Sequence, residues 1–297
     1  MNGLGVVKES RMSGKYNRLS IEAANLQQEG VEAVSTIRKI AKSCAVLILG
    51  KECKPRRVLR GLASGYRMIV SPTDRLSYLV GTYEPHLQKA IRKYVRRGDT
   101  AYDVGANLGY ISLSLAKQVG PDGQIAAFEP IPQNADVLRK NIANNGLSNV
   151  RVFDVAASDR KGEAVIRIAG GNFATSSMVW HKKNSAAEEL VIKTVAIDDL
   201  VKNGELAEPA FVKIDVEGAE GLALKGMQQT VAQSRPVLFI ESSEAGRETT
   251  WQLLRELDYR CRSAITGKWV DGFEEYRHSD FLWFPAGHRE VSKNGNV

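Results

Sequence analysis

The sequence predicts an α/β fold in which a mostly parallel sheet carries helices on both of its faces. From Thr100 onward, short apolar runs of strand length alternate with segments whose apolar residues recur at helical spacing. The turn between the first of these strands and its helix is rich in glycine, as are the ligand-binding turns of such sheets. The composition, with 43% hydrophobic and 25% charged residues among 297, excludes collagen-like and wholly disordered classes.

The region ahead of Thr100 is expected to be accessory. Residues 1–20 are polar and have no period, which indicates a flexible arm. Val31–Leu49 has apolar residues at helical spacing with basic residues between them, so this helix either packs on the body or contacts a membrane surface or a partner. The remaining segments are predicted to be a linker at Lys51–Arg60, a hairpin at Val58–Val70 and an amphipathic helix at Tyr83–Val95.

The body of the chain is predicted to alternate between strands and helices. The predicted strands are Thr100–Val104, Gln124–Phe128, Val150–Ala156, Phe211–Asp215, Val237–Glu241 and Phe281–Phe284. The predicted helices are Tyr110–Val119, Pro132–Asn145, Gly218–Gln233 and Glu248–Leu257. Two segments with alternating apolar residues, Val165–Ile168 and Val191–Ala196, are expected to be additional strands.

Charge is unevenly distributed along the chain. Residues 1–99 contain 19 Lys/Arg and 8 Asp/Glu, a net of +11, whereas residues 100–297 contain 22 and 26, a net of −4. A basic front indicates either a nucleic-acid or membrane-surface arm or only a solvated helical face. We expect an arm and helix at 1–55, a lead-in at 56–99, a core at 100–286 and a flexible tail at 287–297.

The three cysteines form no Cys-x-x-Cys pair, which argues against a zinc site or a disulfide framework. Their odd number fits a reducing compartment, so we expect a cytoplasmic protein. No apolar run near the start approaches the roughly 20 residues that a membrane span needs.

The glycine-rich turn Asp103-Val104-Gly105-Ala106-Asn107-Leu108-Gly109 is the first candidate ligand site. Glycines at Gly105 and Gly109 remove Cβ atoms where a ligand would touch the backbone, and the following helix offers free N–H groups for a carboxylate. The spacing is not the dinucleotide fingerprint, which disfavours NAD, and no Lys-Ser/Thr pair follows to make a P-loop.

Glu129 ends the second predicted strand, 20 positions after Gly109. An acid at this point of such a sheet accepts hydrogen bonds from ribose hydroxyls. The turn, Asp103 and Glu129 together favour a nucleoside-containing ligand, and the alternative is a glycine-rich connector with an incidental acid.

These motifs resemble a known enzyme class. The turn, together with Phe-Glu-Pro at residues 128–130, resembles class I S-adenosylmethionine-dependent methyltransferases, which have a Rossmann-like sheet. The run Val-Lys-Ile-Asp-Val-Glu-Gly-Ala-Glu at 212–220 and Val-Ala-Ile-Asp-Asp-Leu at 195–200 resemble the FkbM-type family. The resemblance extends from about Gly61 to Pro285.

The resemblance implies a set of cofactor-binding residues. Asp103 with Gly105, Asn107 and Gly109 would frame the methionine end of S-adenosylmethionine, and Glu129 would bind the ribose. The remaining implied contacts are Asp154 or the backbone near Ala156 at the adenine, and Glu84 near the sulfonium.

Acids follow five of the predicted strands, at Asp103, Glu129, Asp154, Asp215 and Glu241. We expect Asp215 or Glu217 to orient or deprotonate an acceptor hydroxyl, with Glu241 beside them. In one alternative, Glu217 and Glu220 only favour the positive end of a helix. In another, Asp215, Glu217 and Glu241 hold a divalent cation, although no spacing demands one. The polar stretch 170–189, with Asn172, Ser176, Ser177 and His181, is a candidate substrate lid.

The resemblance therefore implies O-methylation of a hydroxyl on a small-molecule, sugar, glycan or polyketide-like acceptor. A nucleic-acid methyltransferase using the basic front is disfavoured, because the Asp215 segment lacks an Asn/Asp-Pro-Pro-Tyr/Phe motif and acids at the mouth would repel phosphates. We expect no nucleic acid and no membrane span as partners, whereas the basic helix is a candidate for peripheral membrane contact. A non-catalytic cofactor-binding module is the third hypothesis.

Overall fold

The computed structural model describes residues 52–168, 188–242, 244–272 and 279–288. The arm, the Val31–Leu49 helix, residues 170–187 of the candidate lid and the end of the tail lie outside these ranges. The described residues fall into two units, one with 52–53 and 70–76 and the other with 54–69 and residues from 77 onward. The smaller unit contains the start of helix α2 (Pro72–Val80), whose backbone leaves helical geometry at Arg75.

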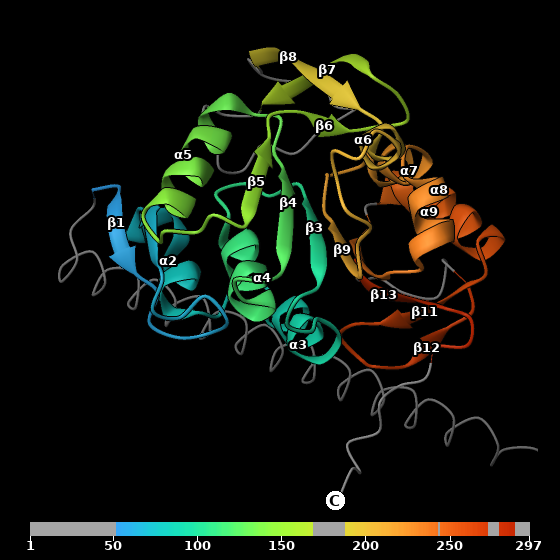
Figure 1. Ribbon diagram of the computed structural model, residues 1–297, viewed down its shortest axis with the longest axis horizontal. Coiled ribbons are helices and arrows are strands. Elements are labelled where there is room, and N and C mark those ends of the chain that lie inside the picture. The colour runs from blue at the N-terminus through green and yellow to red at the C-terminus, as the bar shows by residue number, and fades with distance from the viewer. Residues whose placement is uncertain (1–51, 169–187, 243, 273–278, 289–297) are drawn as a thin grey trace, which may run out of the picture. The chain divides into compact units, whose positions relative to one another are not determined.

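The larger unit is built on an eight-stranded sheet with the order β12-β11-β13-β10-β9-β3-β4-β5 (Figure 1). Its strands are β3 (Thr100–Val104), β4 (Gln124–Phe128), β5 (Val150–Phe153), β9 (Phe211–Ile214), β10 (Val237–Glu241), β11 (Tyr259–Ser263), β12 (Trp269–Val270) and β13 (Asp280–Pro285). Strands β5, β4, β3, β9 and β10 run parallel, and β13 is inserted antiparallel between β10 and β11. The predicted α/β class, a mostly parallel sheet, is therefore confirmed.

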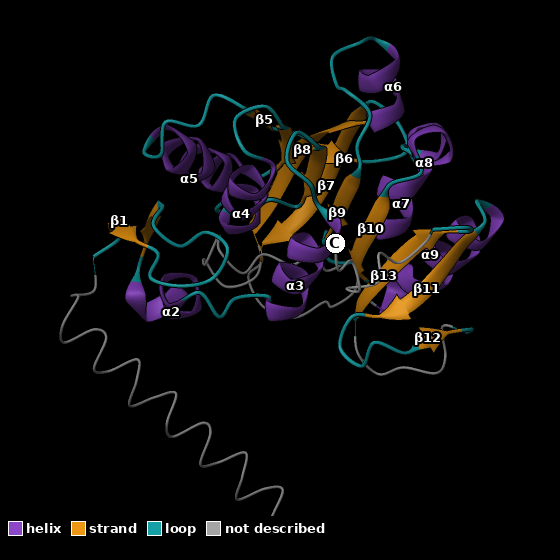
Figure 2. Ribbon diagram, turned by 60° about the horizontal axis from the view of Figure 1, so that its bottom comes forward, coloured by secondary structure: helices purple, strands orange, loops and turns teal. Residues whose placement is uncertain are grey.

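Helices cover both faces of this sheet. The helices are α3 (Pro85–Tyr94), α4 (Tyr110–Val119), α5 (Pro132–Ala143), α6 (Ile197–Lys202), α7 (Glu220–Lys225), α8 (Gln228–Ser234) and α9 (Glu244–Glu256). Side chains of β4 alternate between two cores: Ala126 and Phe128 pack in the cluster that holds residues of α7, α8 and α9, and Ala127 packs with Leu138 and Ile142 of α5. Figure 2 shows α4 and α5 on one side of the strands and α7 and α8 on the other.

A second sheet of three strands has the order β6-β8-β7. It consists of β6 (Ala156–Ala157), β7 (Gly162–Ile168) and β8 (Glu188–Val195). The two additional strands predicted from alternation are therefore present. The predicted strand Val150–Ala156 is wrong at its end, because β5 stops at Phe153 and Ala156 pairs with Thr194 of β8 instead.

The predicted helix Gly218–Gln233 is divided into α7 and α8. The division falls at Gly226, which closely approaches another part of the backbone, since a Cβ there would lie 1.8 Å from the Ser158 carbonyl oxygen. The sequence pattern alone missed this contact, because both helices present apolar residues to the same core.

The predicted linker at Lys51–Arg60 is wrong where β1 (Lys54–Arg57) pairs with β2 (Arg67–Val70). The hairpin was predicted one strand length too late, because β1 is mostly exposed and so lacks an apolar face. The boundary expected at residue 55 falls inside β1. Helices α2 and α6 and strands β11 and β12 are short or polar and were not predicted. None of the helices within the described ranges is both long and apolar enough to cross a membrane.

We predict that Gly226→Ala lowers the free energy of unfolding by about 3 kcal/mol, because the new methyl group meets backbone that has no flexible end to move aside. Chemical denaturation would measure the loss. Gly162→Ala is the matched control, since its Cβ would meet only Thr194 Oγ1 at 3.6 Å. Equal stability of the two variants would contradict the prediction.

Candidate functional site

The carboxyl ends of four parallel strands bring most of the predicted site residues to one edge of the sheet. Asp103 lies near the end of β3, Glu129 follows β4, Asp215 follows β9, and Glu241 is the last residue of β10. Ligands of open parallel sheets bind beyond this edge. The arrangement agrees with the sequence-based expectation for these four acids.

At the centre of this edge is a residue that the sequence analysis did not select, the buried Lys213 of β9. Its side chain is 5% exposed, and it lies opposite Asp103 in the strand register. The ammonium donates a hydrogen bond to the Gly105 carbonyl oxygen at 2.6 Å. The same Nζ atom lies 3.3 Å from Asp103 Oδ1 and 3.5 Å from Asp215 Oδ2.

Lys213 is held in its charged form. Burial alone would lower the pKa of its ammonium, but the carboxylates of Asp103 and Asp215 outweigh burial and raise that pKa above its usual value. A lysine inside the otherwise apolar strand Phe-Val-Lys-Ile was the signal available in the sequence.

Asp103 supports the turn from within the core. It is fully buried, and its Oδ2 accepts a hydrogen bond from Ser112 Oγ of α4 at 2.6 Å. Its Oδ1 accepts no well-aligned hydrogen bond from any described residue, although Lys213 is its ion partner. Asp103 therefore joins β3, α4 and β9 at the base of the site.

The two glycines of the turn are required by contacts inside the protein, whether or not a ligand also touches the backbone there as the sequence predicts. Both have positive φ, 81° at Gly105 and 89° at Gly109. A Cβ on Gly105 would lie 1.9 Å from the Asp215 carbonyl oxygen, and one on Gly109 would lie 2.3 Å from Leu138 Cδ1. Gly109 is also the N-cap of α4 and supplies no side-chain acceptor, so the first N–H groups of this helix have no cap from that residue.

Glu129 connects the end of β4 to the turn. Its side chain is buried, and Oε2 accepts a hydrogen bond from the Asn107 N–H at 2.8 Å. Its Oε1 accepts from the Ile131 N–H at 3.0 Å and from Asn134 Nδ2 at 3.4 Å. Burial raises the pKa of this carboxyl, and the three hydrogen bonds oppose that rise. A carboxylate has about four acceptor positions, so one remains for a ligand.

The two residues expected near the adenine, Asp154 and Ala156, are not part of the central group of buried acids. Asp154 is half exposed beyond the end of β5 and pairs with Arg139 of α5. Ala156 is buried in β6, where it packs in one cluster with Ile131, two residues after Glu129. The structure thus separates Asp154 from the central carboxylates and places Ala156 beside the Glu129 segment.

A second group of carboxylates surrounds Asp215. Burial, followed by the charges of Asp280 and Asp215, raises the pKa of Glu84 to about 7. Burial and then Asp215, Glu84 and Asp280 raise the pKa of Glu241 to about 8. Asp280 was not predicted as a site residue, yet it lies opposite Glu241 in the strand register, and Ser279 Oγ donates to both side chains at 3.1 and 3.4 Å.

Glu217 and Glu220 have different roles. Glu217 is exposed and has a left-handed backbone, with φ of 50°; partial burial followed by Asp215 and Glu220 raises its pKa. Glu220 is buried at the first position of α7, where its carboxylate accepts a hydrogen bond from the Gly218 N–H at 2.8 Å. The helix-terminus alternative therefore describes Glu220, whereas Glu217 stays at the rim.

An aromatic cluster adjoins the carboxylates. The rings of Tyr78, Tyr83 and Tyr110 lie 4.5 to 5.5 Å apart, centroid to centroid. Burial, then Tyr78, Asp215 and Glu84, raise the pKa of Tyr83 above its usual value. Gln88 fixes this segment, because its Nε2 donates to the carbonyl oxygens of Tyr83 at 2.5 Å and of Gly81 at 3.2 Å. This cluster was not predicted from the sequence.

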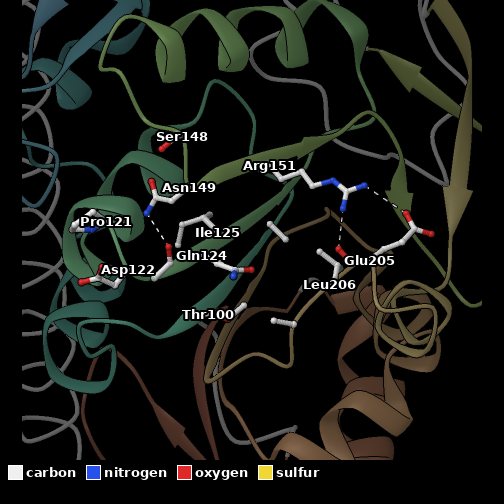
Figure 3. Close-up of a pocket in the computed structure, with 13 residues that line it drawn as sticks. Thr100, Pro121, Asp122, Gln124, Ile125, Ser148, Asn149, Arg151, Glu205 and Leu206 are labelled. Carbon is white, nitrogen blue, oxygen red and sulfur yellow. Dashed lines mark hydrogen bonds and ion pairs between the residues drawn. The ribbon is translucent and has the colours of Figure 1, made fainter.

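A cavity of about 420 Å³ lies at the opposite edge of the sheet, where Thr100 and Gln124 begin β3 and β4 (Figure 3). Arg151 crosses it to pair with Glu205, 3.5 Å away, and donates to the Glu205 carbonyl oxygen at 2.8 Å. Arg151 and Glu205 are thus engaged with each other. This cavity is distinct from the site at the carboxyl ends of the strands.

The described residues contain no group of three or more His, Cys, Asp or Glu side chains arranged to hold a metal ion. The divalent-cation alternative for Asp215, Glu217 and Glu241 therefore has no support in this part of the chain. His181 and the other candidate lid residues lie outside the described ranges.

We predict that Lys213→Met lowers the free energy of unfolding by about 3 to 5 kcal/mol, because it leaves the buried Asp103 carboxylate without a counter-charge. Urea denaturation would measure the loss. Lys225→Met, at an exposed position of α7, is the matched control and should change stability little. A loss below about 1 kcal/mol in Lys213→Met would contradict the central role of this ion pair.

We also predict that stability falls as pH rises from about 5 to about 8. The pKa values of Glu84 and Glu241 are raised in the folded protein, so the native state keeps protons that the unfolded chain releases near pH 4.5. This difference in bound protons stabilises the folded state at low pH. The stabilisation is lost as the pH rises through the folded-state pKa values of about 7 and about 8. Because the Glu241 side chain is partly exposed, Glu241→Gln should raise the free energy of unfolding at pH 9 by only about 1 kcal/mol. The same substitution should make stability depend less steeply on pH.

The measurement is thermal unfolding at pH 5, 7 and 9. The exposed Glu163 of β7 provides the control substitution Glu163→Gln, which should leave the pH dependence as it is in the original chain. A pH dependence that is equally steep in Glu241→Gln would show that the raised pKa is misassigned.

Comparison with known proteins identifies the family. A family model described as the methyltransferase FkbM domain matches residues 103–261. The hexuronic acid methyltransferase AglP of Haloferax volcanii is 31% identical over 139 residues, covering 43% of this chain and 50% of that protein. The 2-O-methyltransferase NoeI of Sinorhizobium fredii is 27% identical over 146 residues, covering 45% and 59%.

The 31-O-demethyl-FK506 methyltransferase FkbM of Streptomyces tacrolimicus is 27% identical over 161 residues, covering 45% and 61%. The chain thus matches about half of the length of these curated relatives. A solved structure of methyltransferase FkbM from Methylobacillus flagellatus aligns over 63% of this chain and 43% of that chain, with 21% identity and a TM-score of 0.41. Because the matched residues 103–261 make up more than half of the sequence, this protein belongs to the FkbM methyltransferase domain family.

Proposed function

We propose that this chain is an S-adenosylmethionine-dependent O-methyltransferase acting on a hydroxyl of a sugar, glycan or polyketide-like small molecule. The observation that carries the proposal is the hydrogen bond between Glu129 and the Asn107 N–H, at the carboxyl edge of the parallel sheet. This hydrogen bond connects the acid that is expected to bind a ribose with the turn that is expected to bind a methionine group. One ligand that contains both groups fits this pairing.

The residues present suit each part of the cofactor. The uncapped start of α4 favours a carboxylate, and the remaining acceptor position of Glu129 favours a ribose hydroxyl. The carboxylates of Glu84 and Asp215 favour a positive sulfonium. For the adenine we propose the wall that Ala156 and Ile131 form, with Asp154 as an outer contact.

Bound S-adenosylmethionine supplies an electrophilic methyl group, so the protein must orient the acceptor hydroxyl and take its proton. We assign the proton to Glu241, because burial and then the charges of Asp215, Glu84 and Asp280 raise its pKa to about 8, near neutral pH. Lys213 lies 3.5 Å from Asp215 and holds its carboxylate in place, which suits an orienting role. Glu217 stays at the rim, where it is proposed to contact the acceptor.

The relatives support the acceptor class. Their names state action on a hexuronic acid, at a 2-hydroxyl and at a 31-hydroxyl of FK506. We extend to this chain the oxygen acceptor that two of these names state, on a hydroxyl-rich molecule. The carboxylates around Asp215 would repel a nucleic-acid backbone, so we propose no nucleic-acid substrate, and the proposed compartment is the cytoplasm.

We predict that Glu129→Gln weakens S-adenosylmethionine binding by about tenfold to a hundredfold, because a buried charged acceptor is lost. Isothermal titration calorimetry measures the affinity, and circular dichroism checks that the variant is folded. Glu163→Gln should bind as the original chain does. Equal affinity of all three proteins would place the ribose elsewhere, and absence of binding to the folded original chain would overturn the proposed function.

A further inference from the structure

A second cavity, of about 560 Å³, lies on the exposed side of α3. Its lining residues are Gly61, Gly81, Pro85, Gln88, Lys89, Arg92 and Lys93. Three of the seven are cationic, and none is acidic. Neither the cofactor site nor the proposed mechanism uses this cavity.

The cationic side chains converge because of their spacing. Lys89, Arg92 and Lys93 are three and four positions apart on one helix, so they share a face of α3. All three are exposed, and within the described ranges no carboxylate pairs with Lys89 or Arg92. The charges of Lys89 and Arg92 therefore remain available to a ligand.

The inner wall of the cavity is rigid. Gln88 is 5% exposed, and its Oε1 accepts a hydrogen bond from the Leu62 N–H at 2.9 Å while its Nε2 donates to two carbonyl oxygens of residues 81 and 83. A Cβ on Gly81 would lie 2.1 Å from the Arg60 carbonyl oxygen, so the backbone on this side is closely packed. The cavity is thus formed before any ligand arrives.

The surrounding sequence reinforces its positive potential. Residues 54–97 contain 11 Lys/Arg and only 2 Asp/Glu. Such an imbalance concentrates anions near a concave surface. Three cations around one cavity match the double charge of a phosphate ester better than the single charge of a carboxylate.

We propose that this cavity binds the phosphate group of a phosphate ester and that the methyl acceptor carries this group. The inference rests on the proposed function. Pro85 lines the cavity and directly follows Glu84, one of the site carboxylates, and Gln88 holds the Tyr83 carbonyl. The cationic cavity and the acidic site are therefore close to each other along the chain. An acceptor with a phosphate at one end and a neutral hydroxyl at the other would place the phosphate in the cavity and the hydroxyl at the acidic site.

The test measures binding of a phosphate monoester directly, by calorimetry with glucose 1-phosphate and by co-sedimentation with phosphatidylcholine vesicles that contain phosphatidic acid. The two arms distinguish a soluble sugar phosphate from a lipid headgroup, and binding in either arm supports the proposal. Glucose and phosphatidylcholine vesicles are the uncharged and zwitterionic controls. Absence of binding in both arms would overturn it.

The variant Lys89→Glu/Arg92→Glu should weaken the observed binding by about tenfold or more. Lys140→Glu/Lys161→Glu changes the net charge equally at two exposed positions that do not line the cavity, and it should bind as the original chain does. An equal loss in both variants would assign the binding to overall charge and overturn the proposal. Titration with S-adenosylmethionine separates the two failures: retained cofactor binding without phosphate binding defeats this inference alone, whereas lost cofactor binding in the original chain defeats the proposed function.

Discussion

The contact between the Lys213 ammonium, the Asp103 and Asp215 carboxylates and the Gly105 carbonyl oxygen determines the geometry of this site. One buried cation holds the ends of β3 and β9 and the glycine-rich turn at fixed distances. The absence of a Cβ at Gly105 lets the Asp215 carbonyl approach the same turn. The buried charges are costly unless they are paired, so the three elements must remain together for the core to remain folded. The geometry of the candidate site and the stability of the fold are therefore coupled through a single side chain.

Around this buried contact, the acids of the site differ in how deeply they are buried. Asp103 and Glu129 lie in the core and take hydrogen bonds from Ser112, Asn107 and Ile131, so their acceptor capacity is mostly used. Glu84 and Glu241 lie further out, where burial and mutual repulsion raise their pKa values. Inner acids thus support the structure, whereas outer acids remain able to exchange a proton. This division follows from depth in the sheet and from the position of the one compensating lysine.

Sequence periodicity predicted the sheet best where strands are short and fully buried, and β3, β4, β10 and α4 occur at the predicted bounds. It was wrong where tertiary contact decides, as at Gly226, where a close backbone approach breaks a helix, and at Asp154, after which the chain enters a second sheet. Strand-end acids could be predicted because parallel strands end at one edge. Lys213 could have been selected as a lysine within an otherwise apolar strand, whereas the roles of Asp280 and Tyr83 depend on pairing across strands and on ring packing.

Gln88 has a consequence for how relatives of this protein diverge. It joins Leu62 of the hairpin region to the carbonyl of Tyr83, and both ends of this connection lie outside the matched span 103–261. Inheritance of the matched span preserves the turn, Glu129 and Lys213. Substitutions in the unmatched lead-in can shift the Tyr83–Glu84 segment while leaving those residues intact. Under the proposed function, the lead-in is therefore a region where acceptor choice can change while the matched span stays the same.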